Sequence, residues 1–376
     1  MTSAKSPDTV DEVERLIAET TGLIGAGRAE EALSTLMGAL PLYGRDARLL
    51  TMAGHAALAV RDSLAAWRYF REAAETGSPI GREGLRGFLA KHAPHWHYFM
   101  LSDTARNTAF VQAIEQRVQP GMLVLDIGAG AGLLSLAAAR AGARVVACEI
   151  SPLIAAVAQE VVEANGLADR ITIHCCHSGR LTVGKHLPEP ADLLVTETFD
   201  GALLGEGALT AIHDAKMRLI KPRAAVIPGS AMVHAVLVES PALVARGSVG
   251  EVAGFDLSAF DRIAPPTVLH HLAPGDYRML HAPVPVGRIE FQGHTQPNAK
   301  KVVPLKIAED GRADAVLFWF KLTLADGISL GNGPEDGFSH WSQAACLLRP
   351  PVPMRAGSRR LLIANQTPQD YHFEVK

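Results

Sequence analysis

The chain has 376 residues, of which 48% are hydrophobic and 20% are charged, and its formal net charge at pH 7 is −3. This length suits two or three domains, and the mildly acidic balance argues against a protein that coats nucleic-acid phosphates. No apolar run approaches the roughly 18 residues that span a bilayer, and residues 1–8 lack the features of a secretory leader. The four cysteines show no disulfide-framework spacing, so we expect a cytoplasmic protein. From the charge and the short apolar runs, we expect it to bind neither nucleic acid nor membrane.

Residues 1–80 are predicted to be helical throughout. Apolar residues recur there at a spacing of about 34, the period of the tetratricopeptide repeat. The first set is Leu16, Ala32, Leu36 and Ala39, and the second is Leu50, Ala66, Phe70 and Ala73. Small residues at such positions let paired helices approach, while large ones fill the space between them. The pattern predicts a tetratricopeptide-like region, with a plain helical bundle as the alternative.

Residues 92–228 alternate strand-type and helix-type segments. The strand-type segments are 122–127, 144–149, 171–175 and 192–196, and helices are expected at 133–140 and through 161. Such alternation predicts a Rossmann-like domain, in which a parallel sheet is covered by helices on both faces.

Residues 229–376 change in character, because proline clusters separate short β-type runs such as 232–238, 316–324 and 361–363. This pattern predicts an antiparallel β domain, closed into a β-barrel. The expected fold class is therefore α/β followed by β, preceded by a helical region.

The predicted strand 122–127 leads through a glycine-rich turn into a helix, a pattern typical of a cofactor loop. Three glycines would let the backbone approach a ligand closely: Gly128, Gly130 and Gly132. Asp126 can order this loop and face the positive end of S-adenosylmethionine, and Glu149 is placed to accept hydrogen bonds from ribose hydroxyls. A dinucleotide site would carry its third glycine at Leu133, one residue later. A purely structural tight turn is the other alternative.

Two carboxylates follow the last strand of this region. Glu197 leaves the strand at the edge where parallel sheets bind ligands, and Gly201 and Gly205 are expected to let the chain fold back until Glu206 faces it. Facing carboxylates can hold a guanidinium group through charge-assisted hydrogen bonds. They would fix one nitrogen in line with the methyl donor, and its proton would leave with or after the transfer. Two surface glutamates on a glycine-rich loop are the alternative.

In this order, four blocks resemble the protein arginine methyltransferase family, from about Trp96 to the end of the chain. They are the segment 100–107, the cofactor loop with Glu149, the pair Glu197 and Glu206, and Ser339-His-Trp. The resemblance implies a class I, Rossmann-like methyltransferase domain that uses S-adenosylmethionine and releases S-adenosylhomocysteine. The helices ahead of it resemble a repeat-bearing branch of the same family.

The resemblance also implies roles for single residues. Arg106 would bind the cofactor carboxylate, and Met100 would border the transferred methyl group. Asp103 would form an ion pair with His340, while Trp341 would help to close the arginine pocket.

Two departures from the family pattern bear on adenine recognition and on assembly. Arg180 stands where the family has an acid that contacts adenine, so we expect His177 and Ser178 to recognise adenine instead. The dimerisation arm, near 240–262, is short, and this puts the family's homodimer in doubt.

The run His174–His177 consists of metal-ligand residue types, but on a strand its members would point to alternate faces and could not converge. We therefore expect no metal. Three functions remain open: methylation of arginine, either in a protein or as free L-arginine; methylation of another small-molecule amine or hydroxyl; and a scaffold without activity. The alanine-, glycine- and arginine-rich composition indicates a GC-rich bacterial source, in which related enzymes acting on free arginine are plausible, whereas the repeats favour a protein substrate.

Overall fold

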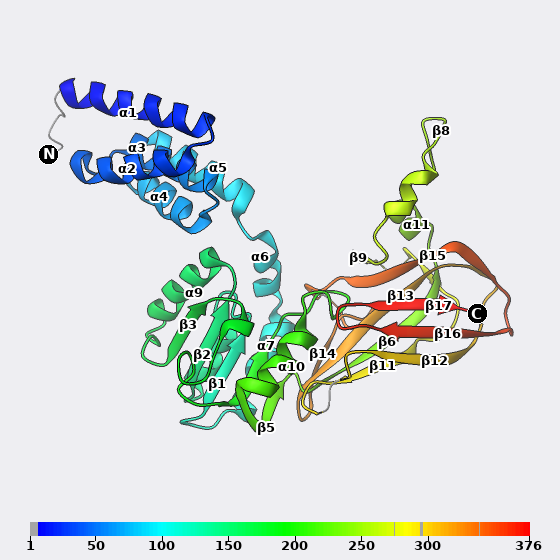
Figure 1. Cartoon of the computed structure of the whole chain (residues 1–376). Coiled ribbons are helices and arrows are strands. Elements are labelled where there is room, and N and C mark those ends of the chain that lie inside the picture. Colours follow the sequence, from blue (N-terminus) through cyan, green and yellow to red (C-terminus); the bar gives the residue numbers. More distant parts are fainter. Residues whose placement is uncertain (1–6, 274, 294–295, 338) are drawn as a thin grey trace. The chain divides into compact units, whose positions relative to one another are not determined.

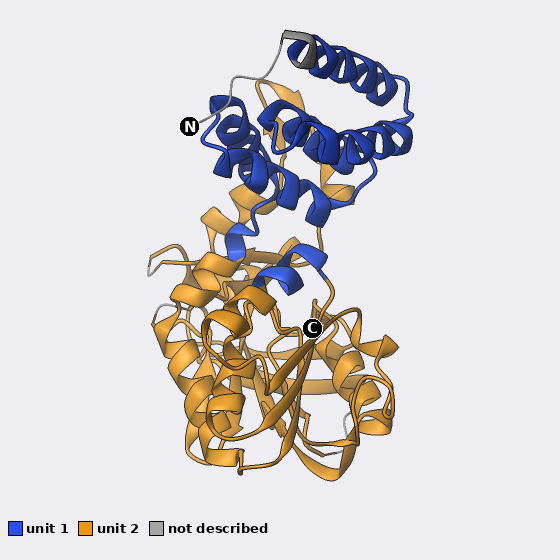
Figure 2. Cartoon of the chain, turned by 90° about the vertical axis from the view of Figure 1, so that its left-hand side faces the viewer, with its two compact units in different colours: residues 1–96, 151–157 blue, residues 97–150, 158–376 orange. Residues whose placement is uncertain are grey.

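The computed structural model describes residues 7–273, 275–293, 296–337 and 339–376. The chain divides into two compact units, one of residues 1–96 with 151–157 and one of residues 97–150 with 158–376 (Figure 2). The first unit is built mainly from five helices, α1 (Pro7–Gly25), α2 (Ala29–Tyr43), α3 (Ala47–Ala59), α4 (Ser63–Glu75) and α5 (Pro79–His92).

Local sequence signals set the ends of these helices. The carboxylate of Asp46 accepts a hydrogen bond from Arg48 N at the start of α3, and that of Asp62 accepts one from Ala65 N at the start of α4. Both satisfy N–H groups that a helix start leaves unpaired. Seven of the eight residues of the sequence pattern are buried, including Leu36 in α2 and Phe70 in α4, and Leu16 is half-buried. The predicted helical region is therefore confirmed.

The second unit begins with a three-layer α/β region. A five-stranded parallel sheet has the order β3-β2-β1-β4-β5. Its strands are β1 (Leu123–Ile127), β2 (Arg144–Glu149), β3 (Ile171–Cys175), β4 (Ala191–Thr196) and β5 (Ile220–Ile227). The helices are α6 (His95–Ser102), α7 (Thr104–Arg117), α8 (Leu133–Arg140), α9 (Pro152–Ala164) and α10 (Ala208–Arg218), with a 3-10 turn η1 (Ser178–Arg180). The first two residues of α6 and the first half of α9 are counted with the first unit. The predicted parallel sheet is confirmed.

Antiparallel strands form the rest of the second unit (Figure 1). The larger sheet has the order β10-β6-β13-β15-β9, with β11 beside β6 and β14 beside β13. Its strands are β6 (Ser230–Glu239), β9 (Val268–His270), β10 (Arg278–Met279), β11 (Val284–Glu290), β13 (Gly311–Ala325), β14 (Ile328–Gly331) and β15 (Gln343–Met354). A second sheet joins β12 (Ala299–Lys306), β16 (Arg359–Gln366) and β17 (Tyr371–Val375). The predicted antiparallel domain is confirmed.

A projecting segment leaves this domain between β6 and β9 (Figure 1). It consists of α11 (Pro241–Gly247), the hairpin of β7 (Glu251–Val252) and β8 (Phe255–Asp256), and the 3-10 turn η2 (Ser258–Ile263). We call residues 241–263 the arm. Several of its apolar side chains face solvent, among them Phe255 at 70% exposure and Ile263 at 74%.

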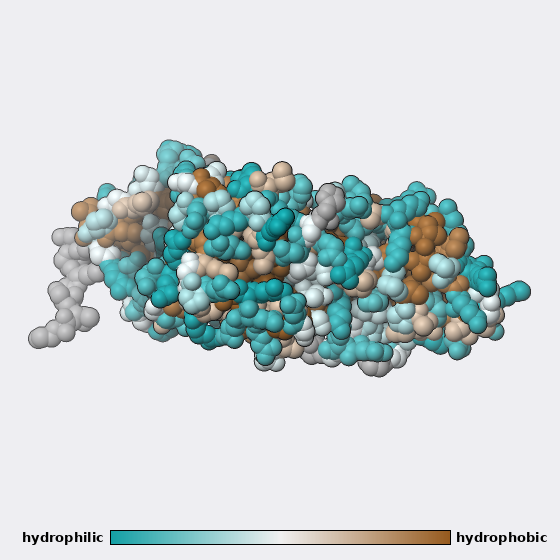
Figure 3. All heavy atoms as spheres, turned by 90° about the horizontal axis from the view of Figure 1, so that it is seen from below, coloured by the Kyte–Doolittle hydropathy of each residue, from teal (hydrophilic) through white to brown (hydrophobic). Residues whose placement is uncertain are grey.

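On the face drawn in Figure 3, hydrophilic side chains predominate and hydrophobic ones gather in separate patches. Among the described residues, every helix falls short of the length and apolar character needed to cross a membrane.

Candidate active site

The cofactor loop joins β1 to α8 and lies at the carboxyl edge of the parallel sheet. Its three glycines all have positive φ angles, 77° at Gly128, 53° at Gly130 and 85° at Gly132. Residues that carry a side chain rarely adopt this backbone conformation. At Gly128 a Cβ atom would also collide with the methyl group of Thr198. The loop therefore requires glycine for its backbone path, and it leaves the backbone open to a ligand.

Asp126 lies in β1 beneath this loop and is 1% exposed. The hydroxyl of Ser135 donates a hydrogen bond to its Oδ2 atom at 2.6 Å. Within the described part of the chain, its Oδ1 atom has no hydrogen-bond partner. Burial raises the pKa of Asp126 to about 6, against the opposing effects of Ser135 and Arg106. The structure thus leaves one buried acceptor open under the loop.

Glu149 ends β2 and reaches the same loop. Its Oε2 atom accepts a hydrogen bond from Gly130 N at 3.1 Å. Each oxygen of a carboxylate can accept more than one hydrogen bond, and hydroxyl groups are suitable donors. Its position at the end of the second strand is where a nucleoside-binding sheet carries its ribose ligand.

The third part of the cofactor region comes from α6 and α7. Met100 is buried in α6, and its methyl group lies near Gly130. Arg106 sits in the first turn of α7, where its backbone N donates to Asp103 Oδ1 at 2.9 Å. Its Nη1 donates to Asn107 Oδ1 at 2.9 Å, and its Nη2 contacts Glu197 Oε2.

Two buried polar atoms test whether a methyl donor of amino-acid type fits here. The Nε atom of Arg106, like Oδ1 of Asp126, has no partner among the described residues. Buried polar groups are nearly always hydrogen-bonded, so each orphaned atom points to a ligand group. The N–H group of Arg106 Nε would bind an anion such as a carboxylate. The Oδ1 atom of Asp126 would bind a cation or a hydrogen-bond donor. S-adenosylmethionine carries a carboxylate, an ammonium group, a sulfonium and a ribose, so the residues present fit it.

The two carboxylates of the predicted clamp lie on the segment after β4. Glu197 is 4% exposed at its side chain, whereas Glu206 is open to solvent as a residue. The pKa of Glu206 is nevertheless raised to about 7, first by burial of its carboxyl and then by the charges of Glu197 and Asp200, with His340 opposing. The charge of Glu197 therefore acts on the carboxyl of Glu206.

The segment folds back as predicted, but other residues than the predicted glycines make the turn. The chain turns with positive φ at Leu203 and Gly207. Gly201 is needed for another reason, because a Cβ atom there would lie 2.5 Å from Ser342 O. At Gly205 a Cβ atom would strike the carboxylate of Asp200, which accepts a hydrogen bond from Gly205 N at 3.1 Å. These two glycines permit close contacts rather than the turn itself.

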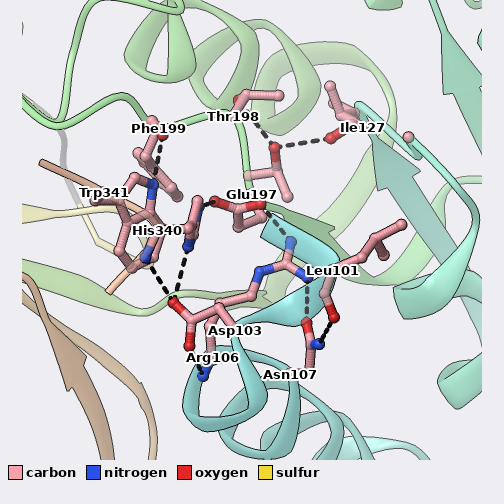
Figure 4. Close-up of polar contacts among 12 residues, drawn as sticks. Leu101, Asp103, Arg106, Asn107, Ile127, Glu197, Thr198, Phe199, His340 and Trp341 are labelled. Carbon is pink, nitrogen blue, oxygen red and sulfur yellow. Dashed lines mark hydrogen bonds and ion pairs between the residues drawn. The ribbon is translucent and has the colours of Figure 1, made fainter. Parts of the chain in front are cut away.

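The loop before β15 carries His340 and Trp341, and it brings His340 next to Asp103 and Glu197 (Figure 4). His340 Nδ1 lies 3.0 Å from Asp103 Oδ2, and its Nε2 lies 3.7 Å from Glu197 Oε1. The backbone N of His340 also donates to Asp103 Oδ2 at 2.9 Å. Trp341 is buried, and its Nε1 donates to Phe199 O at 2.7 Å. Asp103, His340 and Glu197 therefore form one chain of polar contacts.

The expected adenine residues lie around η1. Ser178 is buried, while His177 and Arg180 are exposed. The ring of His177 accepts a hydrogen bond from Gly179 N at 3.0 Å and so caps the turn. The prediction that residues 174–177 share one strand is wrong, because β3 ends at Cys175 and the chain turns into η1.

The sequence interpretation missed Asn332. This residue is fully buried after β14, and its side chain bonds to both loops that carry the acids and the histidine. An asparagine between glycines, Gly331-Asn-Gly333, looks like ordinary turn sequence. The pattern gave no sign of this contact.

The cofactor loop, the acid at the end of β2 and the paired acids after β4 define a class I methyltransferase that uses S-adenosylmethionine. The model of the family "Ribosomal protein L11 methyltransferase (PrmA)" matches residues 106–205, the cofactor half of the site. The arginine N(omega)-methyltransferase of Streptomyces achromogenes subsp. streptozoticus is 38% identical over 271 residues, which cover 71% of this chain and 74% of that protein. The chain therefore belongs to the protein arginine methyltransferase family.

Other relatives agree. Protein arginine N-methyltransferase 9 of Xenopus laevis is 30% identical over 86% of this chain, and protein arginine N-methyltransferase 7 of Mus musculus is 33% identical over 71%. The chain spans 43% and 44% of their lengths, less than half of either animal protein. Among solved structures, the PRMT1 enzyme-prozyme heterotetrameric complex with AdoHcy from Trypanosoma brucei has a TM-score of 0.66 and 24% identity, covering 76% of this chain and 93% of that one. Protein arginine methyltransferase 10 of Arabidopsis thaliana has a TM-score of 0.58 and 18% identity, covering 74% and 95%. These two structures share the fold.

Proposed function

We propose that this protein transfers the methyl group of S-adenosylmethionine to a guanidino nitrogen of arginine. One observation carries the proposal: a buried acid beside the cofactor loop already holds a guanidinium. Glu197 and Arg106 pair through Oε2 and Nη2, and both side chains are 4% exposed. Burial and then the charge of Glu197 raise the pKa of the second acid, Glu206, to about 7. A site with two acids suits the planar, cationic end of arginine.

The bound cofactor supplies an electrophilic methyl group. Glu197 and Glu206 would orient the guanidinium so that one nitrogen faces that methyl, with Arg106 shared with the cofactor carboxylate. As the nitrogen–carbon bond forms and the sulfur–carbon bond breaks, the nitrogen loses a proton. Glu206 has the elevated pKa of a group that can accept this proton near neutral pH, although an arriving guanidinium would lower that pKa. His340, held by Asp103, would keep Glu197 in place.

The names of the relatives support both forms of the substrate. The Streptomyces protein is an arginine N(omega)-methyltransferase, and the animal proteins are protein arginine N-methyltransferases. We infer that an arginine side chain in a protein or free L-arginine enters this site. To distinguish these two substrates, the enzyme is incubated with methyl-labelled cofactor and either L-arginine or an arginine-rich peptide.

The same assay tests the clamp. Glu197→Gln keeps the size of the side chain and removes its charge, so transfer should slow by about 10²–10³-fold. Affinity for S-adenosylhomocysteine, measured by calorimetry, should not fall, because Arg106 stays cationic and keeps its contact with Asn107. Labelling of neither arginine substrate, but of another amine or a hydroxyl compound, would overturn the proposal.

We further propose three domains, a tetratricopeptide-like region at 1–80, the methyltransferase domain at 92–228 and a β-barrel at 229–376. The exposed apolar residues of the arm support a homodimer, because apolar side chains exposed together mark interaction surfaces. The helices at 1–80 would dock a protein partner. The four cysteines form no disulfide, which suits a cytoplasmic protein.

A further inference from the structure

Two loops that meet at the site come from distant parts of the chain. We call residues 197–206 the acid hairpin and residues 339–342 the His–Trp loop. The first carries Glu197 and Glu206, and the second carries His340 and Trp341. How far apart these loops stand decides whether the acids and the histidine can act on one guanidinium.

The side chain of Asn332 lies between the two loops and is fully buried. Its Nδ2 atom donates to Gly201 O in the acid hairpin at 3.0 Å and to Ser342 O in the His–Trp loop at 2.8 Å. Its Oδ1 atom accepts a hydrogen bond from Phe320 N in β13 at 2.9 Å. One amide thus ties both loops to the central strand of the antiparallel domain.

The bonding pattern requires an amide. Two carbonyl oxygens converge on one nitrogen, while a backbone N–H group needs an acceptor from the same side chain. A carboxylate offers no donor and a hydroxyl offers one, whereas an asparagine amide offers two donors and an acceptor. The side chain of Gln343 donates to Asn332 O at 2.9 Å and so holds the residue itself in place.

The loops approach as closely as backbones can. A Cβ atom on Gly201 would lie 2.5 Å from Ser342 O, so no side chain fits between them. Without the amide, the carbonyl groups of Gly201 and Ser342 would lose these two hydrogen bonds, and their dipoles would repel each other. The bond from Trp341 to Phe199 O joins the loops at a second point, nearer to Glu197. Asn332 fixes the part of the hairpin that leads to Glu206.

We propose that Asn332 is a positioning residue for the arginine substrate. It sets the spacing between the acid hairpin and the His–Trp loop, and through that spacing it places Glu206 opposite Glu197. This inference rests on the proposed arginine methylation for its kinetic effect. The spacing itself is independent of the substrate.

The test compares Asn332→Ala with Gln366→Ala. Gln366 is a matched control, because its buried amide also donates to backbone carbonyls, Gln296 O and Pro297 O, and accepts from Tyr371 OH. Its described hydrogen bonds involve neither loop. Each variant is measured for melting temperature, S-adenosylhomocysteine affinity, kcat and KM for the arginine substrate, and amide hydrogen exchange of the two loops.

Both variants should melt several degrees lower and bind S-adenosylhomocysteine as the wild type does. Only Asn332→Ala should speed exchange in the acid hairpin and the His–Trp loop. It should also lower kcat/KM for arginine by about 10- to 100-fold, since a misplacement of about 1 Å has that effect. In a Glu206→Gln background the same change should cost less, because both act through the hairpin.

Wild-type exchange and wild-type kcat/KM in Asn332→Ala would overturn the proposal, as would an equal kinetic loss in Gln366→Ala. If the wild type methylates neither arginine substrate while Asn332→Ala still loosens both loops, arginine methylation fails and the spacing role stands. If Asn332→Ala does not fold, Asn332→Ser, which keeps one donor, takes its place with the same readouts.

Discussion

Replacing Asp126 by Asn should stabilise the ligand-free protein at pH 8. Burial raises the pKa of this carboxyl from an ordinary 3.8 to about 6. The folded state therefore binds the proton more tightly than the unfolded state does. Proton binding by Asp126 therefore stabilises the folded state. This contribution is complete below about pH 4 and is lost as the pH rises through about 6. The difference between 3.8 and about 6 corresponds to about 3 kcal/mol, which is the upper limit of the stability that the uncharged amide recovers.

Asp103 provides the control, because it is a buried aspartate shifted in the opposite direction. Burial disfavours its charge, but hydrogen bonds from Arg106 N, from His340 N and from the His340 ring outweigh burial and lower its pKa. Asp103→Asn should therefore destabilise the protein at pH 8. Calorimetric unfolding of both variants and the wild type at pH 4.5 and pH 8 measures the two effects. The gain from Asp126→Asn should shrink at the lower pH.

The same change should weaken cofactor binding. S-adenosylmethionine carries a sulfonium charge that S-adenosylhomocysteine lacks, so Asp126→Asn should cost more affinity for the first than for the second. A variant that is no more stable than the wild type at pH 8, or equally more stable at both pH values, would refute the reasoning from burial.

Three further predictions concern other parts of the molecule. Because Glu206 must be ionised to hold a guanidinium and its pKa is raised to about 7, kcat/KM for arginine should fall below pH 7, approaching tenfold per pH unit, and Glu206→Gln should flatten this limb. Glu149→Ala should weaken S-adenosylhomocysteine binding by about 1.5–3 kcal/mol in calorimetry, the loss typical of a charged hydrogen bond; unchanged affinity would contradict the ribose assignment. Phe255→Ser with Phe260→Ser should convert a dimer into a monomer in analytical ultracentrifugation, and a monomeric wild type would count against the arm as an interface.

Local sequence patterns were enough to predict the sheet domain. The ranges 133–140, 144–149 and 171–175 agree with α8, β2 and β3 because each is an apolar run bounded by turn residues. Glycine spacing after β1 predicted the cofactor loop for a similar reason, since its positive φ angles belong to three alternate positions, Gly128, Gly130 and Gly132. Both signals act within a few residues.

The contacts that join distant segments could not be read in this way. The pairing of Arg106 with Glu197 spans 91 positions, and the bond from Asn332 to Gly201 spans 131. Nothing near Asn332 distinguishes it from a turn residue, because its partners are backbone carbonyls that any sequence supplies. The role of Gly201 was likewise misjudged, since the atom that excludes a side chain there belongs to Ser342.

The contact between Asp103 and His340 joins residues 237 positions apart. During synthesis, the parallel sheet has left the ribosome long before the histidine does, and domains generally fold as they emerge. A nascent or prematurely terminated chain would therefore hold the methyl donor's loop but lack the group that braces the acid. Chains cut before His340 are therefore expected to bind the methyl donor but to transfer its methyl group slowly or not at all.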